Sequence, residues 1–289
     1  MRKKVIKTGF FFAFLTMLMA FSYPIESTLF EPLIPAQLID VEPCYVENNA
    51  FQDGEEITYK LYYNWNFIWL AAGEVTFRVE DLGDKLHLSA YGRTYKSYEW
   101  FFKVRDNYDT YVDKETLLPI ESVRDINEGK YTLYDKVMFE QDQNLAKSLR
   151  GRSKETAKLS EYRVDACMHD ILSIVYFTRN LNFDGMETGK RIPIKIFMDE
   201  EVWPLQVAYK GKHERKKIKG NGRWNTIKFS PEVISGQVFN EGTEMNVWAS
   251  ADENKIPLLI ESPVSVGSVK AVLKSYKGLK YEQTSKVKK

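Results

Sequence analysis

The sequence predicts a mainly β protein: an antiparallel curved sheet or half-barrel built from two related halves, with one amphipathic helix, about 164–181, between them. Three observations predict this fold class. Apolar and polar residues alternate with period two through most of the chain after residue 54. One stretch repeats its apolar residues at helical spacing instead. Two short patterns also recur late in the chain, which indicates a duplication.

The chain begins with the pattern of an export signal, which we predict over 1–22. A basic segment comes first, and a 12-residue apolar run, 10–21, follows it. Ala20 and Ser22 then fit a cleavage site that leaves Tyr23 first. A membrane anchor is the alternative, but a span needs roughly 20 apolar residues. We therefore expect an exported protein, periplasmic or extracellular, that is soluble after cleavage.

Composition predicts a folded body without a strong overall charge. Hydrophobic residues make up 44% of the chain, and 41 basic residues against 40 acidic residues give a net charge of +1. Such a balance supplies no global field for nucleic acid, so we expect no nucleic-acid partner. After the export signal we predict, in order, an extended arm at 23–50, a first β half at 51–160, a helix and linker at 161–185, a second β half at 186–281 and a flexible tail at 282–289.

The first β half shows the alternation most clearly. Ile57, Tyr59, Leu61 and Tyr63 share one face of a predicted strand, with polar residues between them. Further strands are expected around 75–79, 86–88 and 100–105, where Trp100, Phe102 and Val104 alternate with more polar neighbours.

A hairpin is predicted at 109–123, with its polar turn near 113–116. The tripeptide Val-Arg-Asp stands on both sides of this turn. Folding about the turn predicts a cluster of four charges across the strand pair, formed by Arg105, Asp106, Arg124 and Asp125. We expect this cluster to be a solvated ladder that contributes little to stability.

The predicted helix at 164–181 places a broad apolar arc toward the sheet. His169, Asp170 and Ser173 fall on the remaining arc, which we expect to face solvent. Asp165, His169 and Ser173 follow one another at helical spacing, but a single helix does not give the convergent geometry of a catalytic triad. We therefore predict no catalytic residues here.

The duplication rests on two matches. Gly54, Ile57 and Lys60 recur as Gly189, Ile192 and Lys195. The segment "DKETLLPI", which begins at residue 113, is answered by "DENKIPLL", which begins at residue 252. Each predicted half would then open with an amphipathic strand and carry a late hairpin with proline just after the turn.

These patterns also carry a resemblance. The segments "GEEITYKLYYNW", "AAGEVTFRVE" and "DENKIPLLIESPVSVGSVKAVL" resemble an exported bacterial family known as domain of unknown function 3108, over roughly 44–280. The resemblance implies a β-rich envelope protein and no known activity. The family is also similar in shape to periplasmic lipoprotein carriers, which have a half-open barrel and a helical lid, and this likeness concerns the fold alone.

Three sets of residues are candidate sites. An aromatic set, which either packs the core or lines a ligand cavity, comprises Tyr63, Trp65, Phe67, Trp69, Trp100 and Phe102. A basic turn, which either protects a hairpin tip or meets an anionic envelope surface, comprises Lys210, Lys212, His213, Arg215, Lys216, Lys217, Lys219 and Arg223. The chain's two cysteines, Cys44 and Cys167, form either a disulfide or two buried thiols.

No metal-ligand spacing, phosphate-binding loop or dinucleotide fingerprint occurs in the sequence, so we predict no metal and no cofactor. The function that these observations favour is non-enzymatic binding or carriage of an apolar or amphipathic ligand, such as a lipid. Two alternatives stay open: a hydrolase acting on an envelope polymer, which needs carboxylates converging in a cleft, and a structural interaction module with no small ligand.

Overall fold

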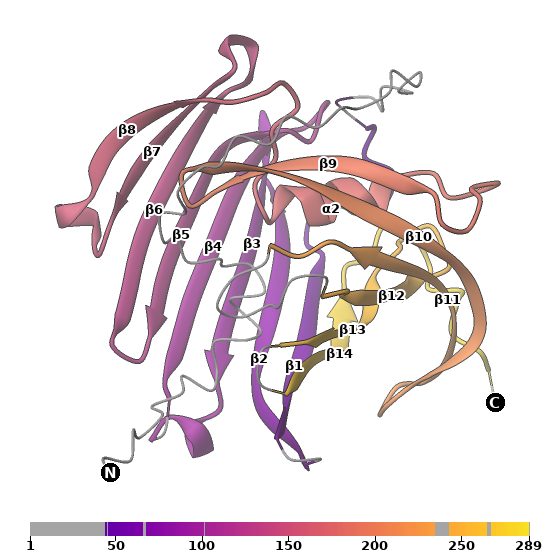
Figure 1. Cartoon of the computed structure of the whole chain (residues 1–289). Helices are drawn as coiled ribbons and strands as arrows, with labels where there is room; N and C mark the ends of the chain where they lie inside the picture. Colours follow the sequence, from indigo (N-terminus) through magenta and orange to yellow (C-terminus); the bar gives the residue numbers. More distant parts are fainter. Residues whose placement is uncertain are drawn as a thin grey trace.

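One curved antiparallel sheet makes up most of the described molecule (Figure 1). The computed structural model describes residues 44, 46–65, 68–100, 102–234, 243–264 and 267–288. The predicted signal at 1–22 lies outside these residues, as does most of the predicted arm. Within the described residues the sheet has 14 strands, and one α-helix lies inside its curve.

The strands follow one another in the order of the chain, with a single exception. The strands are β1 (Glu56–Trp65), β2 (Ile68–Asp81), β3 (Lys85–Thr94), β4 (Val104–Asp113), β5 (Pro119–Glu128), β6 (Tyr131–Glu140), β7 (Leu145–Gly151), β8 (Lys158–Arg163), β9 (Arg191–Met198), β10 (Glu201–Ile218), β11 (Gly222–Pro231), β12 (Asn246–Ser250), β13 (Pro257–Pro263) and β14 (Ser268–Lys277). Their order in the sheet runs from β8 down to β1 and then from β14 down to β9. The exception is the pairing of β1 with β14, and the sheet stays unclosed between β8 and β9.

Alternation along β1 places the core as the sequence predicts. Ile57, Tyr59, Leu61 and Tyr63 are all buried. The residues that alternate with them are more exposed: Thr58 is 9% exposed, and Lys60, Tyr62 and Asn64 are half-buried. The same period holds in β3 and β4, where every second residue is buried. A sheet with one buried face explains this alternation, because successive side chains point to opposite faces.

The predicted hairpin is formed by β4 and β5, but the register differs from our prediction. Arg105 pairs with Asn127, and Arg124 pairs with Tyr108, so the two tripeptides are not opposite each other. The expected four-charge ladder is therefore wrong. Arg105 bonds Glu99 near the surface, whereas Arg124 points into the buried face.

The helix is much shorter than the predicted 164–181. Helix α2 spans Ser173–Asn180, and residues 164–172, which we call the connector, are not helical. Cys167 adopts a left-handed conformation with φ of 62°, which interrupts any helix there. The Asp170 carboxylate then accepts hydrogen bonds from the backbone N–H groups of Leu172 and Ser173, which starts the helix at that point.

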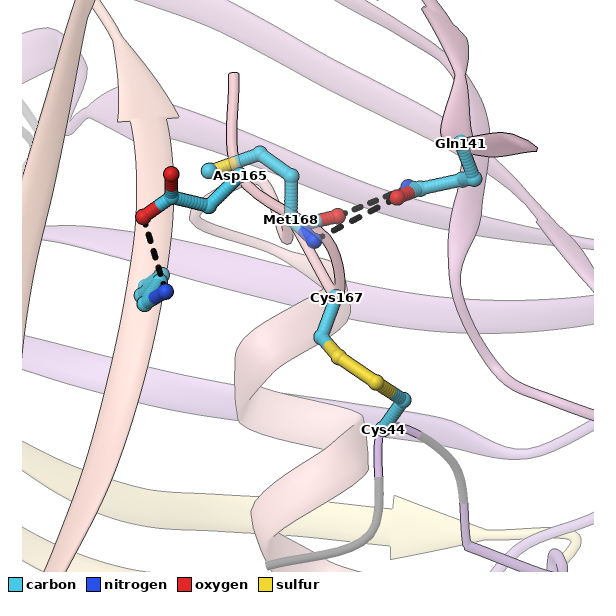
Figure 2. The surroundings of a disulfide bond; sticks show 6 residues. Cys44, Gln141, Asp165, Cys167 and Met168 are labelled. Carbon is cyan, nitrogen blue, oxygen red and sulfur yellow. Dashed lines mark hydrogen bonds and ion pairs between the residues drawn. A yellow bond between two sulfur atoms is a disulfide. The ribbon is translucent and has the colours of Figure 1, made fainter. Parts of the chain in front are cut away.

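The connector lies between the β6–β7 turn and the edge strand β9, and Figure 2 shows some of its bonds. A disulfide joins Cys44 to Cys167, with 4.9 Å between their Cα atoms. Gln141, beside β6, donates to the carbonyl of Met168 at 2.8 Å. On the other side, the backbone N–H of His169 donates to the carbonyl of Lys195 in β9 at 3.1 Å. The connector thus satisfies part of an edge that would otherwise be exposed.

Three further predictions need correction. Trp100 and Phe102 are not strand residues, because a short 3₁₀ turn, Lys96–Tyr98, precedes β4. The basic turn is not a turn for most of its length, since β10 continues to Ile218. The tail predicted to be flexible pairs with β11, where Val287 donates to the carbonyl of Arg223 at 2.9 Å.

The two related halves stay a prediction. The first match falls on β1 and β9, and the second falls on the β4–β5 and β12–β13 turns. In both cases the turn follows the opening strand after the same number of strands. β1 is nevertheless a central strand and β9 an edge strand of one continuous sheet.

Candidate functional site

A partly open apolar cavity lies between α2 and the concave face of the sheet. Its volume is about 220 Å³. Strands β1, β2, β9 and β10–β13 provide its walls, and α2 with the end of the connector covers one side. Apolar side chains make up nearly all of the lining, and six of them are Ile57, Phe77, Ile174, Val175, Phe229 and Val247. Such a shape suits an apolar group with few polar contacts.

One buried ion pair fixes α2 beside this cavity. Both terminal nitrogens of Arg179 bond the Glu55 carboxylate, at 2.6 and 2.8 Å. The guanidinium also donates to the carbonyls of Asn254 and Ala50, and it lies over the rings of Phe51 and Tyr176. Burial opposes its charge, but Glu55 outweighs that effect and raises the pKa of Arg179. The pair is therefore neutral as a whole and orients the helix.

A second buried set of charges lies on the concave face of β5–β7, and we call it the charged cluster: Arg124, Asp135, Arg150 and Asp199. Arg124, Asp135 and Arg150 pair directly across three neighbouring strands. Asp199 reaches them from the β9–β10 turn, where its φ is 55°. Arg150 Nη1 lies 2.7 Å from Asp135 and 2.8 Å from Asp199.

The two arginines and two carboxylates of the charged cluster neutralise each other. Burial alone would raise the pKa of Asp135, but Arg124 and Arg150 hold it below its usual value. Burial likewise opposes the charge of Arg124, and Asp199 and Asp135 raise its pKa despite this. Since the turn that carries Asp199 belongs to the opposite end of the sheet, the cluster joins the two ends by charge.

Asp106 and Glu128 form a buried carboxyl pair next to the charged cluster. They are 0% and 1% exposed. Burial raises the pKa of both groups, and the neighbouring carboxylate of Asp106 raises that of Glu128 further. Asp106 accepts one hydrogen bond, from the backbone N–H of Asn127 at 2.8 Å. Two adjacent carboxyl groups in this setting are stable when they hold a proton between them.

His169, Asp170 and Ser173 are buried, which corrects our expectation that they face solvent. The Nδ1 of His169 lies 3.0 Å from Oγ of Ser173, and burial lowers the pKa of His169 to about 3. Thr110 donates to Asp170 at 2.7 Å. The burial follows from the position of these residues, since they begin α2 against the sheet. Their hydrogen bonds cap the helix and satisfy one another.

Four of the predicted aromatic residues, Tyr63, Trp69, Trp100 and Phe102, do not line the cavity, and the side chain of Trp65 lies outside the described residues. Tyr63 is buried, but β1 ends at Trp65, so Trp69 pairs with Asn64 on the other face of the sheet. Trp69 lies under the ammonium of Lys270, 4.2 Å from its ring centroid. Phe67 lies outside the described residues.

The two aromatic residues before β4 also lie apart from the cavity. Trp100 is 84% exposed, and its indole donates to the carbonyl of Ser97. Phe102 packs at the β5–β6 turn, where Gly129 has a φ of 61° and a side chain would collide with the Phe102 ring. The shared face predicted for Tyr63 and Trp69 assumed one uninterrupted strand, but the chain turns between β1 and β2.

The basic residues are distributed along β10 and its turn into β11. Lys210 and Lys212 pair with Glu244 and Asp184. The ammonium of Lys216 lies 3.8 Å from the ring centroid of Trp248, and burial lowers the pKa of Lys216. The remaining members are exposed and are Arg215, Lys217, Lys219 and Arg223, with His213 beside them. Contact between these residues and an anionic surface stays a prediction.

The charged cluster, the carboxyl pair and the Glu55–Arg179 pair were not predicted from the sequence. One signal was present in the strands: Asp106 alternates in phase with Val104 and Tyr108, and Arg124 in phase with Ile126. A charged residue on the buried parity of a strand needs a partner inside the fold. No such signal marks Glu55, because it precedes β1.

Among the described residues, no group of three histidine, cysteine or acidic side chains is placed to hold a metal ion. No described helix combines the length and the apolar character needed to cross a membrane.

Comparison with solved structures gives a neighbour of similar fold. A β-barrel-like protein of the domain of unknown function DUF1849 from Brucella abortus matches with a TM-score of 0.52 and 10% sequence identity. The match covers 79% of this chain and 98% of that chain. A Bacteroides fragilis protein described as having a YmcC-like fold covers 81% of this chain and 99% of its own, at 11% identity, with a TM-score of 0.28.

Comparison of sequences shows the family. None of the curated proteins compared matches this chain. The model of the family DUF3108, described as a protein of unknown function, matches residues 58–274, which run from within β1 to within β14 and include the helix and all of the cavity lining except Ile57. The chain therefore belongs to the DUF3108 family.

Proposed function

We propose that this chain is a non-enzymatic binding protein for an apolar or amphipathic ligand, which occupies the cavity between α2 and the sheet. The observation that supports the proposal is the cavity itself, about 220 Å³ with an apolar lining. Cavities of this kind in proteins stay dry when empty and accept apolar molecules. We further propose, from the predicted signal at 1–22, that the protein acts after export.

The attachment of α2 also supports binding. Arg179 fixes the C-terminal end of the helix to Glu55 and Asn254, and Asp170 fixes its start. The connector is held by the disulfide at Cys167. A cavity whose cover is fixed at both ends keeps its shape without a ligand, so little conformational entropy is lost on binding.

The test uses protein purified without detergent and a variant that fills the cavity. Val175 lines the cavity from α2 and is half-buried, so Val175→Trp adds bulk inside the cavity without replacing a core residue. We expect the natural protein to carry a lipid in native mass spectrometry, or to take up a hydrophobic fluorescent probe. Val175→Trp should lower probe uptake at least tenfold.

The matched control is Val123→Trp, a half-buried valine of β5 that does not line the cavity. This variant should take up the probe as the natural protein does. Absence of both co-purified lipid and probe uptake would count against the proposal, as would equal uptake by the two variants.

A hydrolase acting on an envelope polymer is the second candidate, and the observation that favours it is the carboxyl pair Asp106 and Glu128. Paired carboxyl groups with separated pKa values carry out acid–base chemistry in such enzymes. Their burial weighs against it, because a polymer must reach the reacting groups. Loss of polymer cleavage in Asp106→Asn and Glu128→Gln variants that remain folded would favour the hydrolase over the binding protein.

A structural interaction module with no small ligand is the remaining alternative. A stable protein partner recovered with a cavity that takes up no probe would favour that function.

A further inference from the structure

The lining of the apolar cavity includes two cationic side chains, Arg179 and Lys255. Their situations differ. Arg179 is neutralised by Glu55, and its remaining donors bond backbone carbonyls. Lys255 forms no ion pair with any residue that the structure describes, and it is half-buried rather than exposed. Among the described residues, Lys255 is therefore a cation of the cavity lining without an ionic partner.

The backbone around Lys255 is held in place by a set of hydrogen bonds. Its neighbour Asn254 is fully buried, bonds the backbone of Tyr281 through both side-chain polar atoms, and accepts from Arg179 through its carbonyl. On the other side, Ser250 and Ile256 bond each other through their backbones at 2.9 Å. Lys255 itself adopts φ of 45°, and its N–H donates to the carbonyl of Asp252.

This arrangement keeps the Lys255 backbone beside the cavity when no ligand is bound. Fixed polar groups at the rim of an apolar pocket determine which end of a ligand stays at the solvent boundary. A flexible surface lysine would lose more freedom in meeting a ligand than a residue in a rigid turn does.

From this geometry we propose that the ligand is a single-chain anionic amphiphile, such as a fatty acid, with its chain in the cavity and its anionic head at Lys255. The proposal rests on the proposed function and names its ligand class. The volume of about 220 Å³ suits one chain rather than two, and because the cavity is partly open, the end of a longer chain can extend beyond it. Each methylene inside the cavity should strengthen binding about fourfold.

The test compares two probes with the same chain and different heads: decanoate, which is anionic, and decanol, which is neutral. Titration calorimetry at pH 7 gives the affinity of each for the purified protein. We expect decanoate to bind about fivefold more tightly than decanol, which is the size expected for a partly exposed ion pair. Lys255→Gln should remove this preference, and Lys255→Arg should keep it.

Lys130→Gln is the matched control, since Lys130 is an exposed lysine in the β5–β6 turn and does not line the cavity. It should leave the preference for decanoate unchanged. A preference that survives Lys255→Gln, or that disappears in Lys130→Gln, would overturn the assignment of the head group.

The two proposals fail in different ways. Equal binding of decanoate and decanol, with both blocked by Val175→Trp, would overturn the anionic ligand and leave the binding function supported. Absence of binding by either probe would overturn both.

Discussion

Strands β4–β7 and strands β11–β13 present the same concave face of one sheet, yet the interiors that they enclose differ in kind. The first carries Tyr108, the carboxyl pair and the charged cluster, which all meet other protein groups. The second carries Phe229, Val247 and their neighbours around an apolar cavity. The filled interior holds two sets of buried charges, whereas the lining of the cavity is apolar apart from a few residues, among them Arg179 and Lys255.

This difference indicates a division of roles. A buried arginine or carboxylate that is already paired has no charge to offer a ligand, so we assign the charged cluster to joining the β9–β10 turn to strands β5–β7. An apolar cavity that protein atoms do not fill lowers stability, because its lining loses contacts. Under the proposed function, a bound ligand would restore those contacts.

The largest expected effect lies at the junction of the two interiors. Replacing both members of the disulfide, as Cys44→Ser with Cys167→Ser, should lower the free energy of unfolding by about 5 kcal/mol, because the bond spans 123 residues of chain. Urea denaturation of the oxidised protein and the double variant measures this loss. Reductant should lower the midpoint of the natural protein to that of the variant and leave the variant unchanged, and equal midpoints before reduction would contradict the expectation.

Removing one member of the charged cluster tests whether the filled interior depends on it. Arg124→Ala leaves buried carboxylates short of a partner and should cost about 3–5 kcal/mol in guanidinium denaturation. The matched control comes from the other copy of the same tripeptide. Arg105→Ala removes an arginine that pairs only near the surface, with Glu99, and should cost under about 1 kcal/mol. Similar losses in the two variants would show that the buried and surface pairs do not differ.

The carboxyl pair adds a pH dependence to the filled interior. Because its folded pKa is raised above the unfolded value, Glu128 keeps a proton that the unfolded chain releases. Stability from this group is therefore full below about pH 4 and falls as pH rises, by about 1.4 kcal/mol per pH unit for each proton.

Glu128→Gln, which has no proton to lose, should flatten this fall. Its gain over the natural protein should be close to zero near pH 4 and grow steadily toward pH 8 in thermal or urea unfolding. His169 has the opposite effect, because burial lowers its folded pKa to about 3 and stability is lost as pH falls below about 6.5. A gain for Glu128→Gln that is constant with pH would show that the pair is not protonated in the folded state.

Much of the sheet could be predicted from the sequence, because alternation records which face of a strand is buried. Ile57 to Tyr63 and the β4–β5 hairpin are examples. The predicted helix was too long for a related reason. Val164 and Met168 are buried in an apolar cluster with Phe139 and Phe197, whereas Ile171 and Ile174 belong to the main core, so their spacing does not come from one helical face.

The cavity could not be predicted in the same way. Its walls come from strands far apart in the chain, and its volume is what packing leaves unfilled, which no local pattern records. The predicted register of β4 against β5 was wrong, because the two tripeptides were matched without considering which face of its strand each residue occupies. Parity alone places Arg124 inside and Arg105 toward the surface.

The pairing of β1 with β14 makes the sheet a cyclic shift of a simple meander, in which the first and last strands of the sheet meet in the middle. Gly54 and Gly278 touch there, so a short linker would join them. A circular permutant closed at that seam and reopened between β8 and β9 would then run strand by strand from one edge to the other. Which strands come first and last is thus a matter of chain order rather than of the sheet's construction, whereas the cavity depends on the stretch that such a permutant would cut.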